Sequence, residues 1–140
     1  MAVKITGKYV GDLKVELTHG PSGATIRTVA PVDNQGDGSS FSPTDLVASG
    51  LAACMVTLMG IASKTHNIHL DGLSFSLEKH MANDPRRIGS VPISIHMPSG
   101  LSPEERLKLE RAAMTCPVHK TLPDELEREV KFVYPEEPQD

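Results

Sequence analysis

Two cysteines are the residues in this 140-residue sequence best suited to redox chemistry. Cys54 lies in an apolar stretch, and Cys116 directly precedes Pro117. Two thiols suffice to reduce a peroxide, because one attacks the O–O bond to give a sulfenic acid and the other condenses with it to a protective disulfide. This requires the two Cα atoms to come within about 7 Å. The alternative is that both are small core residues, since free cysteine is often buried.

A strong helix start precedes Cys54. Ser42 suits the N-cap and Pro43 the first helical position, while Asp45 completes a capping box with Asp in place of Glu. We expect this helix to run from Pro43 to about Thr65 and to carry Cys54 midway along it.

A second helix start precedes Cys116. Ser102 is expected to cap a helix with Pro103 at its first position, reaching about Met114 or Thr115. Cys116 then has the place of an N-cap for a further short turn. Backbone N–H groups at a helix start can lower the pKa of a thiol, so this position favours a reactive cysteine.

The rest of the chain is predicted to form strands, because apolar and β-branched residues alternate between Gly, Pro, Asn and Asp turns. One connection, around Gly11, indicates a hairpin. The order of three strands, a long helix, two strands, two helices and a last strand indicates an α+β fold. We expect a single domain over residues 1–140. The predicted strands are residues 4–10, 12–18, 24–30, 70–81, 88–97 and 129–134.

Composition excludes several classes of protein. The net charge is −4 and no Lys/Arg-rich run occurs, which argues against a nucleic-acid partner. The N-terminus has no long apolar segment of a secretory signal, so we expect a cytoplasmic protein with reduced thiols. Residues 46–63 contain no charge and approach the length of a membrane helix. Their Gly, Ser, Thr and Ala content favours a buried central helix and no membrane partner.

Two motifs resemble those of the OsmC/Ohr family (osmotically inducible protein C and organic hydroperoxide resistance protein). Residues 41–54, FSPTDLVASGLAAC, resemble its central-helix signature, and residues 116–120, CPVHK, resemble its second Cys-Pro motif. The order of elements also matches, so the resemblance covers nearly the whole chain. It implies an OsmC-like α+β fold, with antiparallel sheets packed around a long central helix, in an intertwined homodimer.

The same resemblance implies an enzyme, a thiol-dependent peroxidase that reduces organic or lipid hydroperoxides. In it Cys54 is the attacking thiol and Cys116 the resolving thiol. The sulfur atoms are the redox centre, so no cofactor is expected. An external dithiol is expected to reduce the disulfide.

The activating partners of Cys54 are the point where the resemblance is incomplete. Well-characterised members pair an Arg with a Glu ten residues before the attacking cysteine, and here that position holds Thr44. Asp45 follows, but on a helix it lies about 180° round from Cys54, which favours a capping role. Arg27 is the only Arg before the central helix and is the candidate cation.

Two other functions remain open on the sequence. The missing Glu is compatible with a non-catalytic OsmC-like protein that senses redox state or binds a small molecule. The second alternative function is metal binding, at a zinc site formed by His66, His69, Cys116 and His119. Its spacings are short and no further cysteine knuckle is present, so we expect no metal.

Overall fold

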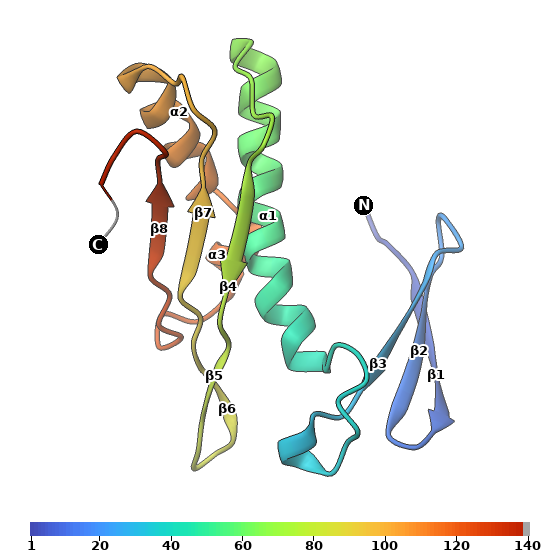
Figure 1. Cartoon of the computed structure of the whole chain (residues 1–140). Coiled ribbons are helices and arrows are strands. Elements are labelled where there is room, and N and C mark those ends of the chain that lie inside the picture. The colour runs from blue at the N-terminus through green and yellow to red at the C-terminus, as the bar shows by residue number, and fades with distance from the viewer. Residues whose placement is uncertain (139–140) are drawn as a thin grey trace. The chain divides into compact units, whose positions relative to one another are not determined.

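The computed structural model describes residues 1–138. It divides into two compact units, Met1–Val47 and the chain from Ala48 onward (Figure 1). The expectation of a single domain over residues 1–140 stays a prediction.

The first unit is an antiparallel three-stranded sheet in the order β1-β2-β3. Positive φ angles at Gly11, Asp12 and Leu13 make the tight turn between the first two strands, and the hairpin predicted around Gly11 is confirmed. All three predicted N-terminal strands are present. The elements are β1 (Ile5–Gly11), β2 (Lys14–His19), β3 (Thr25–Val29) and a short 3-10 helix, η1 (Val32–Asn34).

The two faces of this sheet differ in chemistry, because successive side chains of a strand point to opposite faces. Strand register places an apolar row on one face, where Ile5, Tyr9 and Ile26 are 61%, 67% and 53% exposed. The opposite face carries a row of charged residues. The first face is therefore a contiguous exposed apolar surface.

Helix α1 (Pro43–His66) begins where the sequence predicts. The Ser42 backbone N–H donates to Asp45 Oδ2 at 2.9 Å, and the Asp45 N–H donates to Ser42 Oγ at 3.1 Å. These reciprocal bonds are the predicted capping box. One stripe of the helix is buried, at the spacing that a helix face requires: Ala48, Leu51, Ala52, Met55 and Met59.

Within residues 1–138, α1 is the one helix long and apolar enough to cross a membrane by length and composition, with 28% of its most apolar window buried. The core helix of a soluble protein meets the same two criteria. Its buried stripe joins the apolar cluster of the second unit.

The second unit holds a three-stranded sheet in the order β4-β7-β8 and a separate β5–β6 hairpin. Strands β4 and β7 pair antiparallel, whereas β7 and β8 pair in parallel. The parallel pair departs from an all-antiparallel arrangement, because two helices form the crossover between its strands. The strands are β4 (Ser74–Leu77), β5 (His80–Ala82), β6 (Arg87–Ser90), β7 (Ile93–His96) and β8 (Val130–Val133).

Each of the two long strands predicted at residues 70–81 and 88–97 is broken in the middle. The breaks fall opposite one another, where the Glu78 N–H donates to the Pro92 carbonyl at 3.1 Å. Proline cannot donate to a strand ladder, and a bulge lies between His80 and Met81. The hairpin is present as predicted, but as two short ladders.

Helices α2 (Pro103–Ala113) and α3 (Pro117–Thr121) connect β7 to β8. Ser102 and Glu105 form a full capping box at the start of α2. The core of this unit is one apolar cluster that joins α1, the sheet and α2. Its largest fully buried members are Leu51, Met55, Met59, Ile93, Ile95, Leu109 and Val91.

The end of β8 is fixed to α2 by the buried residue Tyr134. Its hydroxyl donates to Glu110, and the Arg106 guanidinium carbon lies 4.0 Å from its ring centroid. Arg106 also pairs with Glu137 at 2.6 Å. Burial and the Glu110 carboxylate raise the pKa of Tyr134, so the phenol stays protonated and donates.

Candidate functional site

The two cysteines lie together inside the second unit. Both are free thiols, and they lie near enough to one another for the Cys54 thiol to raise the pKa of Cys116. The Cys116 thiol also faces the carbonyl of Leu51, with 3.9 Å between Sγ and O. Leu51 lies on α1 three residues before Cys54, so Cys116 packs against the turn of α1 that carries the other thiol. The structure thus brings together the two residues that the sequence could not place side by side.

The two thiols differ in their access to solvent. Cys116 is 0% exposed, whereas Cys54 is half-buried. Cys54 is therefore the more accessible of the two thiols, and the susceptibility of a thiol to oxidation follows its exposure as well as its thiolate character.

Cys116 is the N-cap of α3, as predicted. The backbone N–H of His119 donates to Cys116 Sγ with an N···S distance of 3.3 Å. Burial raises the pKa of the Cys116 thiol, and the neighbouring Cys54 thiol adds to that rise. The N–H groups of His119 and Val118 act in the opposite direction. The sequence expectation of a lowered pKa is therefore wrong in sign, because desolvation outweighs the backbone donors.

His119 connects Cys116 to an arginine that sequence analysis missed. Its carbonyl accepts a hydrogen bond from Arg128 Nη1 at 3.1 Å. In the described part of the chain its buried Nδ1 atom has no hydrogen-bond partner. No motif marks Arg128, because its contacts exist only once the chain has turned back after α3.

Asp45, a candidate activating acid, forms the capping box of α1 with Ser42. Thr44, at the position where family members carry Glu, has its Oγ1 3.1 Å from Ser42 Oγ. Both therefore take part in the helix start. A catalytic role for Asp45 stays a prediction.

Arg27, the candidate cation, lies on the charged face of the first sheet. Its Nη2 is 3.3 Å from Glu16 Oε2, and Lys8 pairs with the same carboxylate at 3.6 Å. Register places Glu16 opposite both residues on neighbouring strands. Arg27 belongs to the first unit and Cys54 to the second, so its proposed role toward Cys54 stays a prediction.

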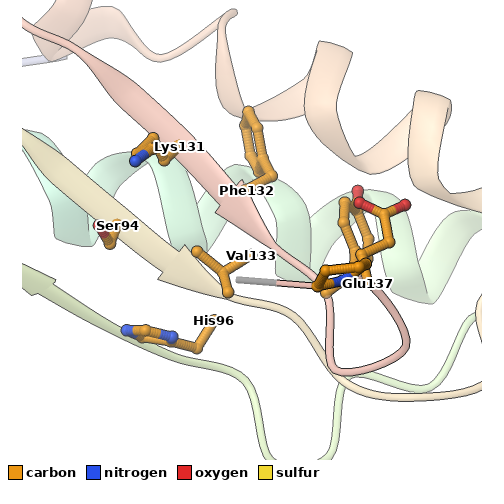
Figure 2. A pocket seen from close by; sticks show the side chains of 8 residues that line it. Ser94, His96, Lys131, Phe132, Val133 and Glu137 are labelled. Carbon is orange, nitrogen blue, oxygen red and sulfur yellow. The ribbon is translucent and has the colours of Figure 1, made fainter. Parts of the chain in front are cut away.

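A shallow hollow lies over β7 and β8, away from the cysteines. Figure 2 shows the labelled side chains Ser94, His96, Lys131 and Val133, which line it along these neighbouring strands. It contains neither cysteine. In residues 1–138 no group of three or more His, Cys, Asp or Glu side chains is arranged to hold a metal ion.

The comparisons with known proteins agree with this fold. The family described as OsmC-like protein matches residues 36–131, which is more than half of the chain. No protein with a curated description matches the chain significantly. Among solved structures, one described as an osmotic stress-induced and detoxification response protein from Psychrobacter arcticus is 39% identical. It covers 94% of this chain and 95% of its own, with a TM-score of 0.85.

Two more distant structures share the fold. OsmC from Legionella pneumophila, described as an organic hydroperoxide resistance protein, is 18% identical with a TM-score of 0.75 and covers 95% of this chain and 97% of its own. The organic hydroperoxide resistance protein OhrB of Bacillus subtilis is 20% identical with a TM-score of 0.68 and covers 94% and 98%. The family match, the 39% identical structure and the α+β fold around the long helix α1 show that this chain belongs to the OsmC-like protein family.

Proposed function

We propose that this protein is a thiol-dependent peroxidase that reduces organic or lipid hydroperoxides. The observation that carries the proposal is that the free Cys116 thiol packs against the turn of α1 that carries the free Cys54 thiol, with 3.9 Å between Cys116 Sγ and the carbonyl oxygen of Leu51. Cys54 is the more exposed of the two thiols, which suits attack on a peroxide, and Cys116 is buried. The hydroperoxide resistance named for two of the similar structures supports the same substrate class.

The proposed reaction has two steps. The Cys54 thiol ionises, and its thiolate attacks the distal peroxide oxygen. The O–O bond breaks, the hydroxyl stays on sulfur as a sulfenic acid, and the departing alkoxide takes up the released proton and leaves as the alcohol. The Cys116 thiolate then attacks the Cys54 sulfur. The S–O bond breaks, water forms, and a Cys54–Cys116 disulfide remains.

An external dithiol completes the proposed cycle by reducing the disulfide. The two thiols carry all the redox chemistry, so the proposed reaction requires no cofactor or metal. We place the protein in the cytoplasm, where cellular dithiols keep cysteines reduced.

We further propose that the protein acts as a homodimer. The apolar face of the first sheet exposes Ile5, Tyr9 and Ile26, and such a patch is typical of an interaction surface. A second copy of the chain is the occupant that the family resemblance favours. Multi-angle light scattering is expected to give the mass of a dimer for the wild type and of a monomer for Ile26→Asp. A monomer mass for the wild type contradicts the proposal.

The activity is tested by adding one equivalent of cumene hydroperoxide to reduced protein, with free-thiol counting and intact mass. We expect the loss of two thiols per chain and a mass that corresponds to an internal disulfide. Cys54→Ser is expected to abolish turnover. Cys116→Ser is expected to react once and then overoxidise. Full activity in the Cys54→Ser protein contradicts the mechanism.

A non-catalytic redox sensor or small-molecule-binding stress protein is the second candidate function. Thr44 at the usual Glu position and the pairing of Arg27 with Glu16 favour it. If the number of free thiols stays unchanged for many minutes after hydroperoxide is added, the result supports this second function over the peroxidase. Ligand binding then becomes the property to measure.

A further inference from the structure

The guanidinium group of Arg128 hydrogen-bonds to carbonyl oxygens at the end of the short helix α3 and in the segment that follows it. The residue is half-buried, and all of its hydrogen bonds described here go to main-chain carbonyls rather than to an acid. The acceptors are the carbonyl oxygens of Leu126 (3.2 Å, from Nε), His119 (3.1 Å, from Nη1), Leu122 (3.5 Å, from Nη2) and Pro123 (2.6 Å, from Nη2).

These bonds supply what α3 lacks by itself. A helix of five residues is too short to be stable alone, and its last carbonyls have no partners within the helix. A cation is also favoured at a helix C-terminus. The planar fork of arginine reaches several carbonyls at once, whereas the ammonium of lysine is a single point charge.

The same short helix positions the buried thiol. The N–H of His119 donates to Cys116 Sγ, and the carbonyl of His119 accepts from Arg128. One residue therefore touches both the thiol and the guanidinium. If the end of α3 frays, the N–H that faces the sulfur is no longer held in place.

We infer that Arg128 is a positioning residue for the resolving step: it holds α3 so that Cys116 is placed to attack the Cys54 sulfenic acid. This role rests on the proposed function. Arg128 touches none of the reacting atoms. It acts through His119 on the second step, in which the S–S bond forms, the S–O bond breaks and water leaves, and it leaves the first attack on peroxide unchanged.

The test separates the two steps by rapid mixing with one equivalent of cumene hydroperoxide, acid quench and intact mass. Arg128→Met removes the donors and keeps the apolar stem, and Arg111→Met, at an exposed arginine of α2, is the matched control. We expect sulfenic acid to form at the wild-type rate in both. Disulfide formation should slow by about tenfold or more in Arg128→Met alone, since bonds to a charged donor are lost. Excess peroxide should then overoxidise this variant.

A rate of disulfide formation in Arg128→Met within about twofold of the wild-type rate overturns the positioning role of Arg128, because the loss of its hydrogen bonds should slow the step by more than that. Equal slowing of both steps overturns it as well, since it indicates general damage to the fold. If Arg128→Met does not fold, Arg128→Lys, which keeps the charge without the fork, is held to the same criteria.

Amide hydrogen exchange gives a readout that needs no peroxide. The His119 amide is expected to exchange at least about tenfold faster in Arg128→Met, while α1 and α2 keep wild-type protection. An unchanged exchange rate of the His119 amide in Arg128→Met contradicts the positioning role of Arg128, even if the protein is a peroxidase. A wild-type protein with slow α3 exchange that forms no disulfide overturns the proposed function and this role with it.

Discussion

The buried thiol of Cys116 predicts a steep pH dependence for the resolving step. Attack on the sulfenic acid needs the thiolate. Burial is the largest cause that raises the pKa of Cys116. The usual cysteine pKa is about 8.5, and below the pKa the thiolate fraction rises tenfold per pH unit. Disulfide formation should therefore accelerate about a hundredfold from pH 6 to pH 8.

The measurement follows disulfide formation by quenched mass spectrometry at each pH, under excess hydroperoxide so that Cys54 oxidation is complete first. The logarithm of the rate should rise with unit slope and show no plateau below pH of about 8.5. Cys116→Ser is the control and should form no internal disulfide at any pH. A plateau at neutral pH would refute the reasoning, because it would mean that the backbone donors of α3 outweigh desolvation.

Protein stability offers an independent check on the same raised pKa. The unfolded thiol ionises first as pH rises, so the contribution of Cys116 is fully present below about pH 8.5 and is lost between that value and its folded pKa. The free energy of unfolding should fall there by up to about 1.4 kcal/mol per pH unit. In Cys116→Ala this decline should disappear, and Tyr134 should add its own decline only above pH of about 10.

Three further substitutions test local roles. Asp45→Ala should lower the free energy of unfolding, measured by urea denaturation, by about 1 kcal/mol because the helix cap is lost. If the rate of Cys54 oxidation is unchanged in this variant, Asp45 has no catalytic role. Arg27→Gln should change the free energy of unfolding by less than about 1 kcal/mol because its ion pair is exposed. Oxidation of Cys54 that is tenfold slower in this variant identifies Arg27 as the activating cation, and an unchanged rate excludes that role. Tyr134→Phe should cost about 1–3 kcal/mol because Glu110 loses its donor, and a neutral effect on the melting temperature contradicts the proposed fixing of β8.

Local signals in the sequence predicted the helix starts and most strand positions. The capping box of Ser42 and Asp45 and the N-cap position of Cys116 depend on neighbours within three residues, so a linear pattern is enough to find them. Alternation along the chain likewise predicted the hairpins. These features are reliable because the groups that satisfy each other are close in sequence.

Features that depend on tertiary packing were not predictable in the same way. The breaks opposite Pro92, the parallel pairing of β7 with β8, and the Arg128 contacts all join segments whose proximity arises only after folding. The sign of the Cys116 pKa shift belongs to the same class. The sequence shows a helix start that favours the thiolate, but burial, which opposes it, is set by residues such as Leu51 on another element.

The geometry of the pair bears on how a disulfide could form. Cys116 Sγ already contacts the turn of α1 that carries Cys54. The proposed disulfide would therefore join two elements that already touch, α1 and the start of the five-residue helix α3. A buried resolving thiol is also shielded from direct oxidation before the second step, so the same burial that disfavours its ionisation protects it from peroxide.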